Sequence, residues 1–120
     1  MHSAFWDDHK RDLSDPEYAR EFAAESARVR TIDTIINAID DARVAAGMSK
    51  AELARAIGSD AAVVRRLLSS SKANPTLGTL AEVAAALGMK VVLEPMTPEE
   101  REAVTKPMTQ GGKSQQVISA

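Results

Sequence analysis

Cysteine is absent from this 120-residue sequence and aromatic residues make up only 3% of it. Without cysteine the chain can form neither a disulfide nor a thiolate metal site. The only two histidines, His2 and His9, lie in the first nine residues, where a tail is a simpler interpretation than a metal cluster. No Ser/His/Asp set and no glycine-rich phosphate loop stands out either. We therefore expect no enzyme, no metal and no cofactor.

Long apolar runs are also missing. The first 25 residues carry ten charged side chains, which leaves no place for the apolar region of a secretory signal. No run approaches the ~20 apolar residues that a membrane-spanning helix needs. These absences predict a cytoplasmic protein with no membrane partner.

Alanine, in contrast, occurs at 21 positions. It is the strongest helix former and a poor strand residue, so the composition favours closely packed helices. The formal net charge of −2 argues against a nucleic-acid partner, but the charge is unevenly spread. Residues 1–47 hold 6 basic and 10 acidic groups, residues 48–94 hold 6 and 4, and residues 95–120 hold 3 of each. The chain thus has an acidic N-terminal part and a mildly basic centre.

Capping residues and apolar spacing divide the chain into helices. The first helix can start at Ser14 or at Asp15, and apolar residues then recur at helical spacing up to a stop at Gly47. The pattern leaves open whether residues 16–46 form one helix or two. Three short helices follow, with predicted caps at Ser49, Asp60 and Thr76. Their predicted inward residues are Leu53, Ala54, Ile57, Val64, Leu67, Leu68, Leu77, Leu80, Val83, Ala84 and Leu87.

Residues 89–94 predict one short strand, which Pro95 ends. A lone strand leaves backbone groups unpaired. It could pair with the same strand of a second copy, with a partner protein or with the N-terminal segment of its own chain. We favour a homodimer, with dimerisation through the helices as the alternative. A last short helix is expected to begin at Thr97 and to end before Pro107.

Two short helices joined by a tight turn at Gly58 are the pattern of a helix-turn-helix. The chain resembles Cro/cI-type (XRE) helix-turn-helix domains in GMSKAELARAIG at 47–58, VRRL at 64–67, NPTLGTL at 74–80 and ALG at 86–88. The resemblance covers residues 29–94 and implies an all-α, lambda-repressor-like five-helix domain that ends in one short C-terminal strand. An acidic N-terminal helical extension (1–28) precedes it, and a short helix with a flexible tail (95–120) follows. The implied partner is a double-stranded DNA operator.

Two further segments, LSDPEYAREF at 13–22 and ALGMKVVL at 86–93, are similar to HigA-type antitoxins. This similarity implies a repressor that regulates its own operon and neutralises a partner toxin, often a ribosome-dependent RNase. One alternative is a stand-alone XRE-type regulator without a toxin. Another is a protein-interaction module that has kept the fold and lost operator binding. A small, basic, toxin-like reading frame beside the gene would distinguish the antitoxin from the stand-alone regulator.

In a helix-turn-helix the second helix lies in the major groove of DNA. The residues predicted to face the bases are Ala61, Ala62, Arg65 and Arg66, and those predicted to contact phosphates are Ser49, Lys50, Ser69, Lys72 and Asn74. Arg65 is the best candidate reader, because a guanidinium can bind guanine O6 and N7 together.

The chain departs from the family pattern in two places. Alanines stand at 61–62, where members usually have a polar pair. Leu68 and three serines stand at 68–71, where many members have Glu followed closely by Gly. Both departures leave few side chains to hydrogen-bond with bases, so we expect base readout to be narrow.

Overall fold

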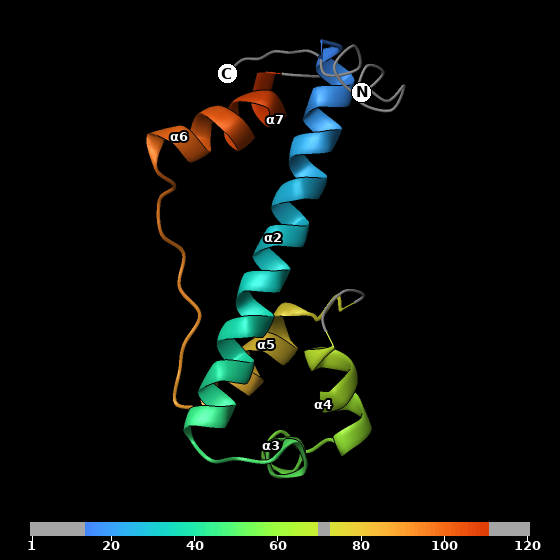
Figure 1. The fold of residues 1–120 in the computed structure, drawn as a ribbon, viewed down its shortest axis with the longest axis vertical. Helices are drawn as coiled ribbons and strands as arrows, with labels where there is room; N and C mark the ends of the chain where they lie inside the picture. Colours follow the sequence, from blue (N-terminus) through green and yellow to red (C-terminus); the bar gives the residue numbers. More distant parts are fainter. Residues whose placement is uncertain (1–13, 70–72, 111–120) are drawn as a thin grey trace, which may run out of the picture. The chain divides into compact units, whose positions relative to one another are not determined.

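The computed structural model describes residues 14–69 and 73–110, and every regular element in them is helical (Figure 1). The helices are α2 (Pro16–Ala45), α3 (Lys50–Ala56), α4 (Ala61–Leu68) and α5 (Leu77–Ala86), followed by α6 (Pro98–Glu100), the π-helix η1 (Arg101–Thr105) and α7 (Lys106–Gln110). The last three are continuous, so the described residues form five helical segments. The predicted all-α class is confirmed. None of the described helices has the length and apolar character that a membrane span requires.

The helix α2 is a single helix of 30 residues, which answers the question that the sequence left open. Asp15 precedes its first residue, and the carboxylate oxygen Oδ1 of Asp15 accepts a hydrogen bond from the amide of Glu17 at 3.0 Å. Pro16 then occupies the first helical position, where its missing N–H costs nothing. Neither glycine nor proline interrupts the sequence from 17 to 45, so no residue breaks the helix.

The described helices belong to two compact units. Residues 30–93 form one unit, which contains the second half of α2 together with α3, α4 and α5. The other unit contains the first half of α2 and the α6–η1–α7 stretch. The helix-turn-helix pattern falls in residues 30–93, so the candidate site is built within that unit alone.

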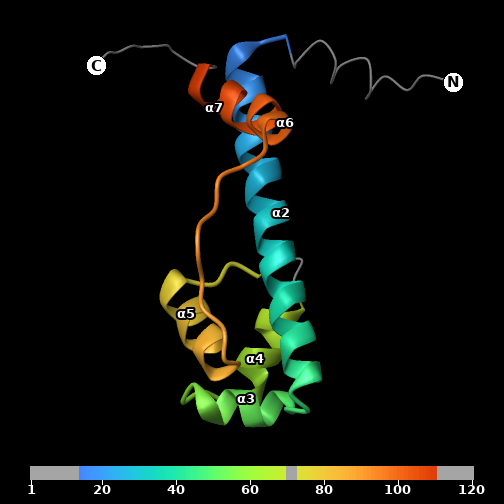
Figure 2. The same cartoon turned by 90° about the vertical axis from the view of Figure 1, so that its left-hand side faces the viewer.

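The core of the 30–93 unit takes buried side chains from every one of its helices. They are Ile36 and Ile39 of α2, Leu53 and Ala54 of α3, Val64 and Leu67 of α4, and Leu80 and Val83 of α5. Figures 1 and 2 both show α3, α4 and α5 gathered around the C-terminal half of α2. Burying an aliphatic side chain of this size contributes about 1.5–3 kcal/mol, so this cluster is the main source of stability for the unit.

One predicted core residue is wrongly assigned. Leu77 was expected to point inward, but it is 70% exposed. It is the first residue of α5, directly after the capping residue Thr76, whose Oγ1 accepts a hydrogen bond from Thr79 N at 3.1 Å. Leu80, one turn later, reaches the core instead. Helical spacing gives the correct stripe, but it does not show at which turn the helix meets its neighbours.

The predicted end of the last helix before Pro107 is also wrong. The predicted start is confirmed, because Thr97 and Glu100 form a capping box through hydrogen bonds of 2.8 and 3.1 Å. The helix then passes through Pro107, which is the second residue of α7. Proline lacks a donor and clashes with the carbonyl four residues earlier in an α-helix. The π-helical turn η1 lies immediately before it, with Lys106 N bonded to Arg101 O, and widens the spiral at that point.

The strand predicted at 89–94 is not formed in the structure, where residues 89–97 have no regular secondary structure. The reason is physical: a strand exists only when its backbone groups bond to a neighbouring strand. The other described segments of the chain are helices and their connections, so they offer no such neighbour. Figures 1 and 2 show the segment as a plain trace between α5 and α6.

The core assignment predicts unequal effects from two identical substitutions. Leu53→Ala removes a side chain that is 0% exposed, so we expect the free energy of unfolding to fall by about 2–5 kcal/mol. Leu77→Ala, the matched control at an exposed site, should change it by less than about 0.5 kcal/mol. Urea denaturation followed by circular dichroism measures both. Equal losses in the two variants would contradict the assignment of this core.

Candidate nucleic-acid interface

The candidate interface is built on α3, α4 and the turn between them. Two backbone hydrogen bonds close the end of α3, from Ser59 N to Ala54 O at 2.8 Å and from Gly58 N to Arg55 O at 3.1 Å. This is the Schellman arrangement, and it requires a left-handed residue, which is Gly58 with φ of 68°. The turn sends the chain directly into α4, and α3 and α4 pack against each other.

Ala54 lies at the point where α3 meets the rest of the unit, and it is almost completely buried. A side chain of this size lets helix backbones come close together. Val64 and Leu67 occupy the buried side of α4, as the sequence predicted. The packing of α3 thus fixes which side of α4 is turned to solvent.

The start of α3 is a complete capping box. The Ser49 hydroxyl accepts a hydrogen bond from Glu52 N at 3.0 Å, and the Glu52 carboxylate accepts one from Ser49 N at 2.7 Å. These hydrogen bonds lower the pKa of Glu52 below its ordinary value. The bond from the Ser49 backbone has the larger effect, and the bond with the Ser49 side chain has the smaller one. The predicted cap is therefore confirmed, and it places a carboxylate at the N-terminus of α3.

Arg43 ties the end of α2 to the segment that leads into α3. Its Nη2 lies 2.9 Å from Asp40 Oδ1, and its Nη1 donates a hydrogen bond of 2.9 Å to the carbonyl of Met48. The Arg43 side chain is only 15% exposed. A guanidinium held in this way by a carboxylate and a carbonyl fixes how the chain enters α3.

The helix α4 presents one exposed face. Asp60 caps the helix by accepting a hydrogen bond from Val63 N at 3.1 Å. The exposed residues that follow are Ala62, Arg65, Arg66 and Ser69, whereas Ala61 is half-buried. Three of the four predicted base-facing residues therefore share a single solvent-facing stripe.

The two arginines of this face are not neutralised by neighbours. Among residues 14–69 and 73–110, no carboxylate forms an ion pair with Arg65 or Arg66, whereas Arg20, Arg28 and Arg43 are each paired. No carboxylate in the described part of the chain therefore competes with an external partner for either guanidinium. Asp60, at the start of the same helix, is the nearest acidic residue along the chain and reduces the local positive charge.

The residues predicted to contact phosphate differ in how ready they are to do so. Lys50 is half-buried at the start of α3, and Asn74 is exposed before α5. The Ser69 hydroxyl donates a hydrogen bond of 2.9 Å to Arg66 O, so it would have to leave that bond to reach a phosphate. Lys72 lies outside the described residues.

Two features of the site were missed by the sequence reasoning. Arg43 was given no role, although an aspartate three residues earlier was a signal for an ion pair. Arg55, exposed on α3, was not considered as a contact at all. No group of three or more His, Asp or Glu side chains in the described part of the chain could hold a metal ion.

The two helices and the glycine turn between them define a helix-turn-helix unit. The comparison with protein families agrees: residues 39–92 match the family described as helix-turn-helix. The matched segment starts near the end of α2 and extends past α5, so it contains all of α3 and α4. No curated protein and no solved structure gives a significant match to the chain.

The capping box makes a prediction about acid stability. Because the pKa of Glu52 is lowered in the folded chain, its ionised form stabilises the fold above its unfolded pKa. This contribution is lost as the pH falls through the lowered, folded pKa. Glu52→Gln should therefore show a smaller loss of unfolding free energy between neutral and acid pH than the parent chain. Glu82→Gln, on α5 and outside any cap, is the control and should keep the acid dependence of the parent.

Proposed function

We propose that this chain is a sequence-specific DNA-binding transcriptional repressor of the cytoplasm, without enzymatic activity. The observation that carries the proposal is the exposed face of α4, the helix after the glycine turn, where Arg65 and Arg66 form no ion pair with any carboxylate among the described residues. The helix-turn-helix match over residues 39–92 supports the same function.

In this proposal α4 enters the major groove with its N-terminal part nearest the bases. Arg65 binds a guanine through its two terminal nitrogens, and Arg66 either reads a base or holds a phosphate. Ala61 and Ala62 contact thymine methyl groups or allow the backbone to come close. Lys50 at the start of α3, with Ser49, Ser69, Lys72 and Asn74, completes the contacts to the phosphates.

The operator would be a two-fold symmetric DNA site bound by a homodimer. Two copies of α4 double the number of base contacts, and helix-turn-helix dimers bind half-sites about 34–36 Å apart on one face of DNA. Each copy has a narrow readout because of Ala61 and Ala62. A single copy would therefore have little specificity, which is the reason to expect a dimer.

Arg65→Ala tests the assignment of the base contact. Loss of the bidentate guanine contact costs about 1–3 kcal/mol in each of the two copies, so the operator affinity of the dimer should fall at least roughly 30-fold while non-specific binding falls much less. A mobility-shift titration of the DNA upstream of the gene measures this change. Arg30→Ala removes the same charge from an exposed position on α2 and should leave operator affinity nearly unchanged. If Arg65→Ala binds as tightly as the parent, the assignment of this contact is wrong.

We further propose that the repressor is an antitoxin that regulates its own operon. The likeness of residues 13–22 and 86–93 to HigA-type antitoxins supports this finer assignment. The first half of α2 also offers exposed carboxylates at Glu17, Glu21 and Glu25, which suit a basic toxin. Glu17 and Glu25 make i,i+3 ion pairs with Arg20 and Arg28, and each such exposed pair contributes only about 0.2–0.5 kcal/mol. A partner's basic groups could therefore replace them at little cost.

A growth assay separates the antitoxin from a stand-alone regulator. A small basic protein encoded beside this gene should stop growth when expressed alone, and co-expression of this chain should restore growth. Arg65→Ala should still restore growth while it loses repression, because the two activities use different surfaces. Replacing Glu17, Glu21 and Glu25 by Gln should abolish the restoration of growth and leave repression intact. If no protein encoded beside this gene stops growth when it is expressed, the chain is a stand-alone regulator.

A second candidate is a protein-interaction module that no longer binds an operator. It is favoured by Ala61 and Ala62 and by the two carboxylates, Glu52 and Asp60, that cap the helices nearest the DNA. The DNA titration decides between the two, because phosphate contacts make affinity fall steeply with salt concentration. Absence of any salt-dependent affinity for DNA would favour the interaction module.

A further inference from the structure

We propose that residues 90–94 form an antiparallel two-stranded ribbon with the same residues of a second copy of this chain, in the register that centres on Val92. The ribbon defines the dimer that the proposed function requires, and in that sense it rests on the proposed function. It also explains why a sequence with strand character has no strand in the single chain.

From Lys90 to Glu94 the segment is exposed and has no regular secondary structure. It starts after the glycine turn that ends α5, where Met89 N donates to Ala84 O at 2.7 Å. From there to α6 no backbone hydrogen bond within the described residues involves the segment until Thr97. Its apolar side chains are left in solvent: Val92 is 65% exposed and Leu93 is 99% exposed. A soluble chain rarely leaves consecutive large apolar residues uncovered unless another surface covers them.

Symmetry limits the registers in which such a segment can pair with itself. Directly opposite residues in an antiparallel pair point to the same face of the ribbon, and neighbours along a strand point to opposite faces. A two-fold axis perpendicular to the ribbon must therefore lie midway between one residue and the same residue of the second copy. That central residue is directly opposite its own copy, and no register that places two neighbouring residues opposite each other is allowed. The central candidates are Val91, Val92 and Leu93.

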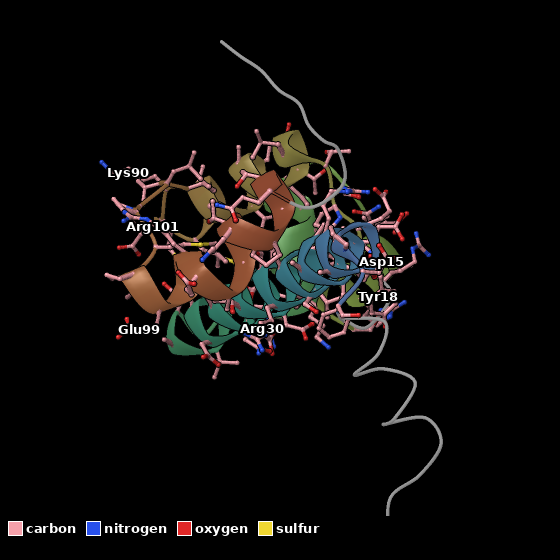
Figure 3. All side chains as sticks on the ribbon, turned by 90° about the horizontal axis from the view of Figure 1, so that it is seen from above. Asp15, Tyr18, Arg30, Lys90, Glu99 and Arg101 are labelled. Atoms are coloured by element: carbon pink, nitrogen blue, oxygen red, sulfur yellow. The ribbon has the colours of Figure 1, made fainter. Side chains whose placement is uncertain are left out.

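Charge selects one of these registers. With Val92 on the axis, Lys90 lies opposite Glu94 of the partner, and Glu94 lies opposite the partner's Lys90. Opposite charges that face each other across strands stabilise the pair, and like charges destabilise it. Centring on Val91 or on Leu93 opposes neither charge with the other. Lys90 is exposed, and its side chain extends away from the backbone of its own chain (Figure 3).

The same register covers the most exposed apolar side chain of the segment. Val91 lies opposite Leu93 of the partner on one face, so each copy covers the other's Leu93, which is 99% exposed in the single chain. Lys90, Val92 and Glu94 share the other face, where Val92 lies opposite its own copy between the two charge pairs. Pro95 has no N–H and ends the ladder after Glu94, and in this register Met89 would lie opposite it, so the paired residues are the five from 90 to 94.

These features commit the segment to a second copy rather than to another partner. The charge pattern is complementary to itself under two-fold symmetry, which no partner of different sequence would require. Residues 14–69 and 73–110 include no second extended segment of strand character that could take the same place. A toxin strand on this edge, or dimerisation through helices, is then an outcome that the tests can reveal.

Cysteine cross-linking of the full chain tests the register, because the sequence has no cysteine of its own. Val92→Cys places the two thiols opposite each other, with ~5 Å between α-carbons, within disulfide reach. Leu93→Cys, the control, places them ~8 Å apart, beyond the ~7 Å limit. We expect a rapid disulfide dimer for Val92→Cys only. Random collisions would instead favour Leu93→Cys, because that side chain is the more exposed one, and this result would overturn the register.

Charge exchange tests the ribbon by an independent measurement. Sedimentation of the full chain without DNA gives the dimer dissociation constant. Lys90→Glu and Glu94→Lys each place like charges opposite each other twice, so each should raise this constant roughly tenfold. The double variant K90E/E94K restores opposite pairs and should return close to the parent value. No effect of the single variants, or no recovery in the double variant, would refute the pairing.

These outcomes are separate from those of the proposed function. A chain that stays dimeric in K90E and E94K dimerises through another surface, such as its helices, and the ribbon is then wrong. If the parent chain is a monomer in sedimentation and still shifts operator DNA, the ribbon is wrong and the proposal of DNA binding stands. Conversely, loss of DNA binding in Arg65→Ala leaves the sedimentation result unchanged, because α4 contributes nothing to the ribbon.

Discussion

The helix-turn-helix depends on one shared core to which each of its four helices contributes a fully buried side chain. Ile36, Leu53, Val64 and Val83 come from α2, α3, α4 and α5 in turn, and none is more than 1% exposed. The helices α3 and α4 have only 7 and 8 residues. Isolated helices shorter than about 12–15 residues are marginal in water, so neither would persist without this contact. The exposed arginine face of α4 therefore exists because Val64 on its other side is buried.

Local hydrogen bonds decide how these short helices follow one another. A side-chain cap starts α3, α4 and α5, and Gly58 turns the chain from the first to the second. Each cap contributes about 1 kcal/mol, which is a large share for a helix of two turns. Arg43 adds a longer link, from Asp40 in α2 to the carbonyl of Met48. Core and caps together leave little freedom in the direction of α4.

The electrostatics of the chain follow from pairing rather than from net charge. Ion pairs occupy Arg20, Arg28 and Arg43, while the arginines of α4 have no such partner among the described residues. The same unit keeps Glu52 and Asp60 at the starts of α3 and α4. These carboxylates are needed as caps, but they oppose a phosphate backbone. In the proposed complex with DNA, this balance predicts a modest affinity per copy.

Much of the fold was predictable because its signals are local. The caps at Ser49, Asp60, Thr76 and Thr97 and the stops at Gly58 and Gly88 depend on residues within one turn of each other. The exposed face of α4 follows from helical spacing once its buried side is known. The predictions failed where a distant or an absent neighbour decides. Leu77 has helical spacing but no neighbour to cover it, and Pro107 is tolerated because of the π-turn before it.

The sequence by itself determined where α3, α4, α5 and α6 begin and where α3 and α5 end, because hydrogen bonds between near neighbours set these features. It also determined the helix-turn-helix class. Only the tertiary structure decided that residues 16–45 are one continuous helix, that Arg43 holds the entry to α3, and that residues 90–94 pair with no other strand among the described residues. The physical reason is the same in each case. Burial and strand pairing depend on which segments meet in space, and local sequence does not contain that information.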